Sequence, residues 1–201
     1  MTKKQFIDLI IHRLAGGNVS SDQIGRFDRR IVAKNASIAM DSMFMELFRN
    51  NESLLDLYAK DYDVTLTDDA ILNLSYAQLP KKIVQLPGNA AIRLISARQD
   101  QTFFIPLVDS RAQGVFACLD VSRLDDTMYG FMTGERIYFK NKRVDIDDVI
   151  IKLIRPLDDY AWTDNVYLPS GKGFEIANLV DQLMERMPKE DMRNDNNTVV
   201  E

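Results

Sequence analysis

The residues of this chain that could do chemistry are few and scattered. Its 201 residues include one histidine, His12, and one cysteine, Cys118. No HExxH motif or histidine cluster is present, so a zinc or iron site of that kind is excluded. Cys118 has no partner for an internal disulfide, and we expect a small core residue in a reducing compartment rather than a nucleophile. His12 is expected to be a structural residue of a helix.

Pairs of adjacent aspartates are the remaining candidates for metal chemistry. They are Asp68-Asp69, Asp125-Asp126, Asp147-Asp148 and Asp158-Asp159. The segment around Asp147 lacks the alternating oxygen ligands, central glycine and closing glutamate of an EF-hand. Most pairs lie at predicted turns, where aspartate is favoured by local hydrogen bonding. We therefore expect no metal, no cofactor and no enzymatic activity, with a small metal-dependent hydrolase as the less favoured alternative.

Phosphate-binding and nucleophile motifs are also missing from the sequence. There is no GxSxG elbow, GxxxxGK[ST] loop or GxGxxG turn. The net charge of −5 argues against a protein that mainly grips nucleic acid, because neutralising phosphates needs clustered lysine and arginine. An acidic surface would suit a channel along which DNA slides without sticking. The apolar runs are too short to cross a membrane, and we expect synthesis in the cytoplasm without secretion.

The composition, with 46% hydrophobic and 27% charged residues, is that of a globular protein. Apolar periodicity predicts three helices, the first of them introduced by the capping box Thr2 and Gln5. Phe174 is expected on the apolar stripe of the last helix. The predicted helices span residues 3–15, 23–49 and 172–187.

Between the helices, alternating apolar and polar residues predict a β-rich body over residues 61–168. Residues 62–66 and 72–76 are expected to pair as a hairpin around an Asp68-Asp69 turn. Thr133-Gly134 predicts a second tight turn. The fold class is therefore α+β, in which the helices pack with a central, mostly antiparallel sheet or small barrel. We expect one domain over residues 1–188 and a flexible C-terminal tail over residues 189–201.

Several residues are candidates for contact with other subunits or partners. Near the end of the second helix, Phe44, Met45 and Phe48 widen the apolar stripe over most of the helix circumference. Such a surface is either deeply buried or shared with a neighbour. A basic and aromatic strand around Arg136 and Tyr138, with Lys140, Lys142 and Arg143, could meet an acidic partner, although an ordinary solvated strand is the simpler interpretation. Val199 and Val200 are the only apolar anchors of the tail.

The order of several short segments resembles a known family. These segments are residues 4–17, residues 79–87 between two Leu-Pro pairs, the strand 134–139, and residues 168–171 before a helix followed by Pro188 and Asn194 to Asn196. Together they resemble the connector-ring, or head-to-tail adaptor, proteins of crAss-like short-tailed bacteriophages that infect Bacteroidetes. The resemblance spans most of the chain, and none of its segments is a chemical signature.

The resemblance implies a virion structural protein without catalytic residues. Its subunits would form a ring, expected to be twelve-membered, below the portal protein, where they continue the DNA channel and join portal to tail. Its partners would be the portal and neighbouring tail or ring proteins, and the genome would pass through the channel without specific binding. Another tail or nozzle component of the same virion is the alternative that sequence alone hardly separates.

Overall fold

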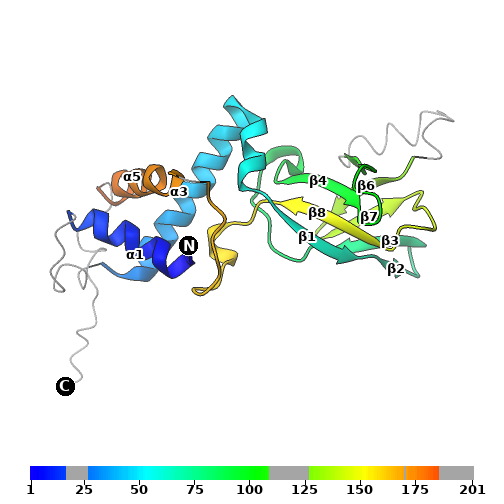
Figure 1. The fold of residues 1–201 in the computed structure, drawn as a ribbon, viewed down its shortest axis with the longest axis horizontal. Coiled ribbons are helices and arrows are strands. Elements are labelled where there is room, and N and C mark those ends of the chain that lie inside the picture. The colour runs from blue at the N-terminus through cyan, green and yellow to red at the C-terminus, as the bar shows by residue number, and fades with distance from the viewer. Residues whose placement is uncertain (17–26, 109–126, 170, 186–201) are drawn as a thin grey trace, which may run out of the picture. The chain divides into compact units, whose positions relative to one another are not determined.

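A computed structural model describes residues 1–16, 27–108, 127–169 and 171–185 of the chain (Figure 1). The chain divides into two compact units, which we call the helical unit (Met1–Tyr58 with Pro156–Glu201) and the β unit (Ala59–Arg155). Helices together with mainly antiparallel sheets confirm the predicted α+β class. That residues 1–188 behave as one domain stays a prediction.

The helical unit is organised around one long helix. Its α-helices in the described residues are α1 (Lys3–Leu14), α3 (Arg29–Asn50) and α5 (Lys172–Glu185), with short 3-10 turns η1 (Glu52–Tyr58) and η3 (Leu157–Asp159). Both α1 and α5 pack on α3 and on each other. The interior between them is apolar, and its buried side chains include Phe6, Ile10, Val32, Ala36, Met40, Phe44, Ile176 and Val180.

Capping residues set where these helices begin. The capping box predicted for α1 is confirmed, because Thr2 Oγ1 accepts from the Gln5 backbone and Gln5 Oε1 accepts from the Thr2 backbone. α3 begins at Arg29 because the Asp28 carboxylate accepts from the backbone N–H of Arg30 at 2.7 Å. The predicted start at residue 23 lies outside the described residues, while Phe27 and Asp28 precede the helix.

The β unit contains two sheets in the described residues. Its strands are β1 (Lys60–Thr65), β2 (Thr67–Asp69), β3 (Leu74–Gln78), β4 (Ile92–Ala97), β5 (Leu107–Val108), β6 (Tyr129–Thr133), β7 (Arg136–Lys140) and β8 (Asp148–Leu153), and a 3-10 turn η2 covers Pro87–Asn89. Their orders are β1-β8-β4 and β2-β3-β7-β6-β5. The described strands form no closed barrel, and among their pairings β5 with β6 is parallel.

The predicted hairpin between residues 62–66 and 72–76 is wrong. β1 instead pairs with β8, with Val64 opposite Val149, and the hairpin is made by β2 and β3. The Asp69 carboxylate accepts from the backbone of Ile71 and Leu72 and so closes the turn after β2. The predicted turn at Thr133-Gly134 is confirmed: Gly134 has a φ of 61° and joins β6 to β7.

Candidate interaction surfaces

The apolar residues that the sequence singles out near the end of α3 separate into core and surface. Phe44 is 1% exposed, and its ring meets Tyr58 edge to face with centroids 5.2 Å apart. Phe48 and Met45 are half-buried. Phe44 therefore belongs to the core of the helical unit, and Met45 is the member of the set that reaches a surface hollow.

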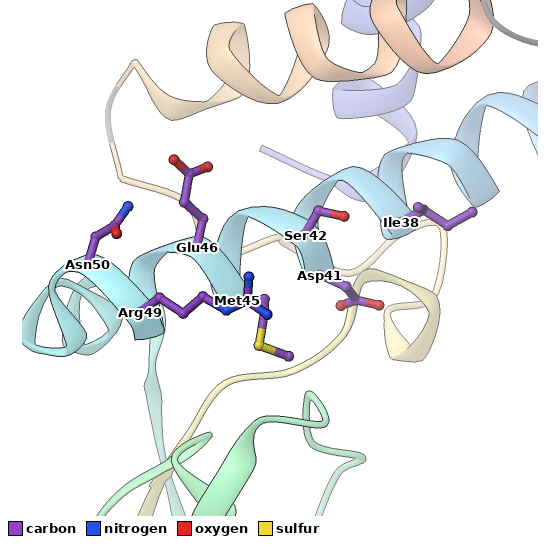
Figure 2. Close-up of a pocket in the computed structure, with 7 residues that line it drawn as sticks. All are labelled: Ile38, Asp41, Ser42, Met45, Glu46, Arg49 and Asn50. Carbon is purple, nitrogen blue, oxygen red and sulfur yellow. The ribbon is translucent and has the colours of Figure 1, made fainter.

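That hollow runs along one face of α3, and we call it the α3 groove (Figure 2). Its lining residues are Ile38, Asp41, Ser42, Met45, Glu46, Arg49 and Asn50. With 3.6 residues per turn, Ile38 and Met45 lie on the side of the helix opposite the buried residues Ala36 and Met43. Ile38 is 44% exposed. The groove thus combines an apolar floor with polar and charged flanks.

The electrostatics of the α3 groove are acidic. Two carboxylates, Asp41 and Glu46, lie within it against a single cation, Arg49, among its lining residues. Burial, followed by the nearby negative charge of Asp158, raises the pKa of the Asp41 carboxyl above its ordinary value. Like charges held together at a half-apolar surface favour the approach of a cation.

Along α1, from Lys3 to Arg13, the helical unit exposes a second set of large, mostly aromatic side chains, which we call the aromatic surface. It consists of Met1, Trp162, Tyr167 and Phe174, each of which is exposed. The Met1 carbonyl accepts from Val166 at 3.0 Å, and the Met1 side chain packs beside Gly173. Met1 thereby links the segment that carries Tyr167 to the start of α5.

Cations lie directly beside these rings. The guanidinium of Arg13 stands 5.9 Å from the centre of the Phe174 ring and donates to Asn178 Oδ1. Lys3 Nζ lies 5.4 Å from the Trp162 ring and donates to the Tyr160 carbonyl at 2.9 Å. Exposed aromatic rings beside arginine have the composition of interface hot spots. The aromatic surface is therefore a candidate for protein contact.

Sequence reasoning missed this aromatic surface. Phe174 was expected on the buried stripe of the last helix, yet it is 57% exposed. It lies in the first turn of α5, more than a quarter turn away from the buried direction set by Ile176 and Val180. Trp162 and Tyr167 lie in irregular backbone, where no periodicity identifies a face. Their residue types alone were the signal that could have found them.

The predicted basic and aromatic strand, β7, forms a compact cluster on the β unit. Tyr138 is 7% exposed and packs between Tyr76 and Phe131, with ring centroids 5.6 Å and 5.7 Å away. The Arg136 guanidinium lies 4.5 Å from the Tyr76 ring, and the hydrogen bond to Tyr138 is the main cause that raises the pKa of Arg136. Asp69 accepts from Tyr138 at 3.4 Å. These contacts hold the sheet together and leave Arg136 exposed.

The other basic residues of that prediction have acidic neighbours. Lys142 Nζ lies 3.1 Å from Asp147, and Arg143 lies 3.0 Å from Asp145. Lys140 is exposed at the end of β7. The positive charges of Lys142 and Arg143 are therefore partly neutralised, which weakens the attraction of this surface for an acidic partner. Val199 and Val200 lie outside the described residues.

The aspartate pairs are dispersed over the fold. Asp148 accepts from Thr65 at 2.7 Å, while Asp147 pairs with Lys142 as described above. Within the described residues, no three histidine, cysteine or acidic side chains are grouped so that they could hold a metal ion. The pair Asp125-Asp126 lies outside those residues. No helix in the described part of the chain is long and apolar enough to span a membrane.

Comparison with known proteins adds no family assignment. No model of a known protein family matches the chain, and no curated protein is significantly similar to it in sequence.

Proposed function

We propose that the chain is a structural subunit of a bacteriophage virion, which forms a ring in the head-to-tail connector below the portal. There it continues the DNA channel and joins the portal to the tail. The resemblance of its ordered segments to connector-ring proteins suggests this role. The observation that carries the proposal is the α3 groove, an exposed helix face with an apolar floor that has the character of a protein contact.

A ring places a specific requirement on its subunit. Closed cyclic assemblies larger than a dimer use heterologous contacts, in which one surface of a subunit meets a different surface of the next. The helical unit offers two such surfaces, the α3 groove and the aromatic surface, and they differ in composition. Both carry exposed apolar side chains, among them Ile38 and Phe174. The presence of two unlike surfaces on one subunit favours a ring over a symmetric dimer.

The charge of the chain is compatible with a DNA channel. The net charge of −5 gives a surface that repels phosphate overall. A channel subunit must let the genome pass without holding it, because each neutralised phosphate would add affinity. We therefore expect the DNA to pass without specific binding.

The test is the mass of the purified protein, alone and mixed with the virion's portal protein, measured by light scattering and negative-stain microscopy. A ring, or a monomer that becomes one on the portal, supports the proposal. A monomer that ignores the portal but binds another tail protein would instead favour a tail or nozzle component. If divalent cations raise the melting temperature and Asp147→Asn abolishes a hydrolytic activity, the structural role is refuted.

A further inference from the structure

We infer that neighbouring copies of this chain join through the helical unit, with Phe174 and Arg13 of one copy seated in the α3 groove of the next. The inference rests on the proposed function, because it names the contact that would close the ring. It commits the groove to one occupant, a second copy of this chain. The observations that support it concern shape, charge and placement.

The apolar parts of the two surfaces are complementary. Phe174 projects from the first turn of α5 with more than half of its surface exposed. The groove offers Ile38 and Met45 as an apolar floor about two helical turns in length. A thioether beside an aromatic ring is a favourable contact, and methionine adapts its shape to the ring that it meets. Burying Phe174 there would remove two exposed apolar surfaces from water.

The charges of the two surfaces are complementary as well. Arg13 stands over the Phe174 ring, so the guanidinium and the ring would enter the groove together. Asp41 and Glu46 lie on either side of the line from Ile38 to Met45. An incoming guanidinium would relieve the repulsion between Asp41 and Asp158 that contributes to the raised pKa of Asp41. Arginine is also the cation best suited to bind a carboxylate through two hydrogen bonds.

The placement of the two surfaces suits a head-to-tail contact. α1 and α5, which carry Arg13 and Phe174, pack on one side of α3. The α3 groove lies on the other side, opposite the buried residues of that helix. Both belong to the helical unit, so their separation does not depend on the β unit. A copy can therefore use both surfaces at once, as a ring requires.

The first experiment is cross-linking between two single-cysteine variants. In a Cys118→Ser background, Ile38→Cys and Phe174→Cys are prepared separately and treated with a short bismaleimide under conditions in which the wild type assembles. We expect little cross-linked dimer from either variant alone and abundant dimer from their mixture. The variant that carries both cysteines should give a ladder of multimers. The control replaces Ile38→Cys with Leu57→Cys, a 53% exposed residue of η1, and should not cross-link to Phe174→Cys.

The second experiment is a charge exchange between copies. Asp41→Arg alone and Arg13→Glu alone should each require at least roughly tenfold more protein to assemble, because each variant places like charges in every contact. In a mixture of equal amounts, alternating copies would restore opposite charges at every contact, so assembly should return. Recovery in the mixture also shows that both variants fold.

The outcomes separate this contact from the proposed function. If the wild type forms rings, but the cysteine mixture gives no more dimer than the Leu57→Cys control and the charge variants assemble normally, the contact is wrong and the ring stands. If dimer forms equally within each single-cysteine variant, the contact is symmetric and the inference fails. If the wild type stays monomeric with and without portal protein, both the contact and the proposed function are overturned.

Discussion

Phe44 gives the sharpest test of how α3 divides between core and surface. Its ring is 1% exposed and packs against the buried Tyr58 ring. Phe44→Ala removes the ring and leaves a cavity, so the free energy of unfolding should fall by roughly 3–5 kcal/mol. The edge-to-face contact with Tyr58 accounts for about 0.5–1.5 kcal/mol of that loss. Because a domain's total stability is only about 5–15 kcal/mol, the variant should lose a large fraction of it.

The assay is urea denaturation followed by far-UV circular dichroism, together with the Tm. At about 2–4 °C per kcal/mol for a chain of this size, the Tm should fall by roughly 6–20 °C. A double-mutant cycle with Tyr58→Leu should return the aromatic coupling energy. Leu57→Ala, next to Tyr58 but 53% exposed, should change stability by no more than about 0.5 kcal/mol.

The opposite pattern would refute the burial of Phe44. If Phe44→Ala cost less than about 1 kcal/mol of stability yet abolished assembly, the ring would lie at a subunit contact, which is the second of the two alternatives that the sequence left open. Ile38→Ser is the matched surface variant on the same helix. It should leave the Tm nearly unchanged and weaken assembly, because Ile38 lies in the α3 groove and not in the core.

Four further predictions concern pH, packing and cooperativity. The hydrogen bond from the backbone N–H of Leu72 lowers the pKa of the Asp69 carboxyl below 3.8. The stability that the ionised Asp69 contributes is therefore present above pH 3.8 and is lost as the pH falls through the folded-state pKa. Asp69→Asn should lower the free energy of unfolding in urea at neutral pH but not at the acid end. The pH dependence of the Asp41 contribution is the reverse, because burial raises the pKa of its carboxyl. The stability that Asp41 contributes is present below pH 3.8 and is lost as the pH rises through the raised pKa. Asp41→Asn should therefore stabilise the free subunit at neutral pH. Gly130→Ala would place a Cβ 3.0 Å from Ile137 Cγ2 and should cost roughly 1–3 kcal/mol by thermal denaturation. If residues 1–188 are one folding domain, the fluorescence of Trp162 and far-UV circular dichroism should show a single coincident transition, whereas two separate transitions would contradict that prediction.

Local signals explain which parts of the fold could be predicted from the sequence. The capping box of Thr2 and the turn at Gly134 depend on residues within a few positions of each other, and both are confirmed. The pairing of β1 was mispredicted because alternation reveals a strand but not its partner. Thr65 pairs with Asp148, 83 residues away, and nothing near either residue specifies that distance.

The candidate surfaces were harder to predict for a related reason. Apolar residues on a helix show which side is buried only when the helices that cover it are known. Phe44 and Met45 are neighbours in the sequence, but 100° of helical rotation places Phe44 in the core and Met45 in the lining of the α3 groove. Trp162 is exposed because of an irregular segment whose path no periodic pattern specifies.

The composition of the α3 groove also bears on how copies of this chain can meet. Across a two-fold axis near Met45, Arg49 of one groove would lie at the level of Asp41 of the other, so the charges of the groove allow a groove-to-groove dimer. Such a dimer would leave uncovered the exposed Phe174 ring with Arg13 beside it. A head-to-tail contact covers both the apolar floor of the groove and that ring, and it is the kind of contact that a ring needs.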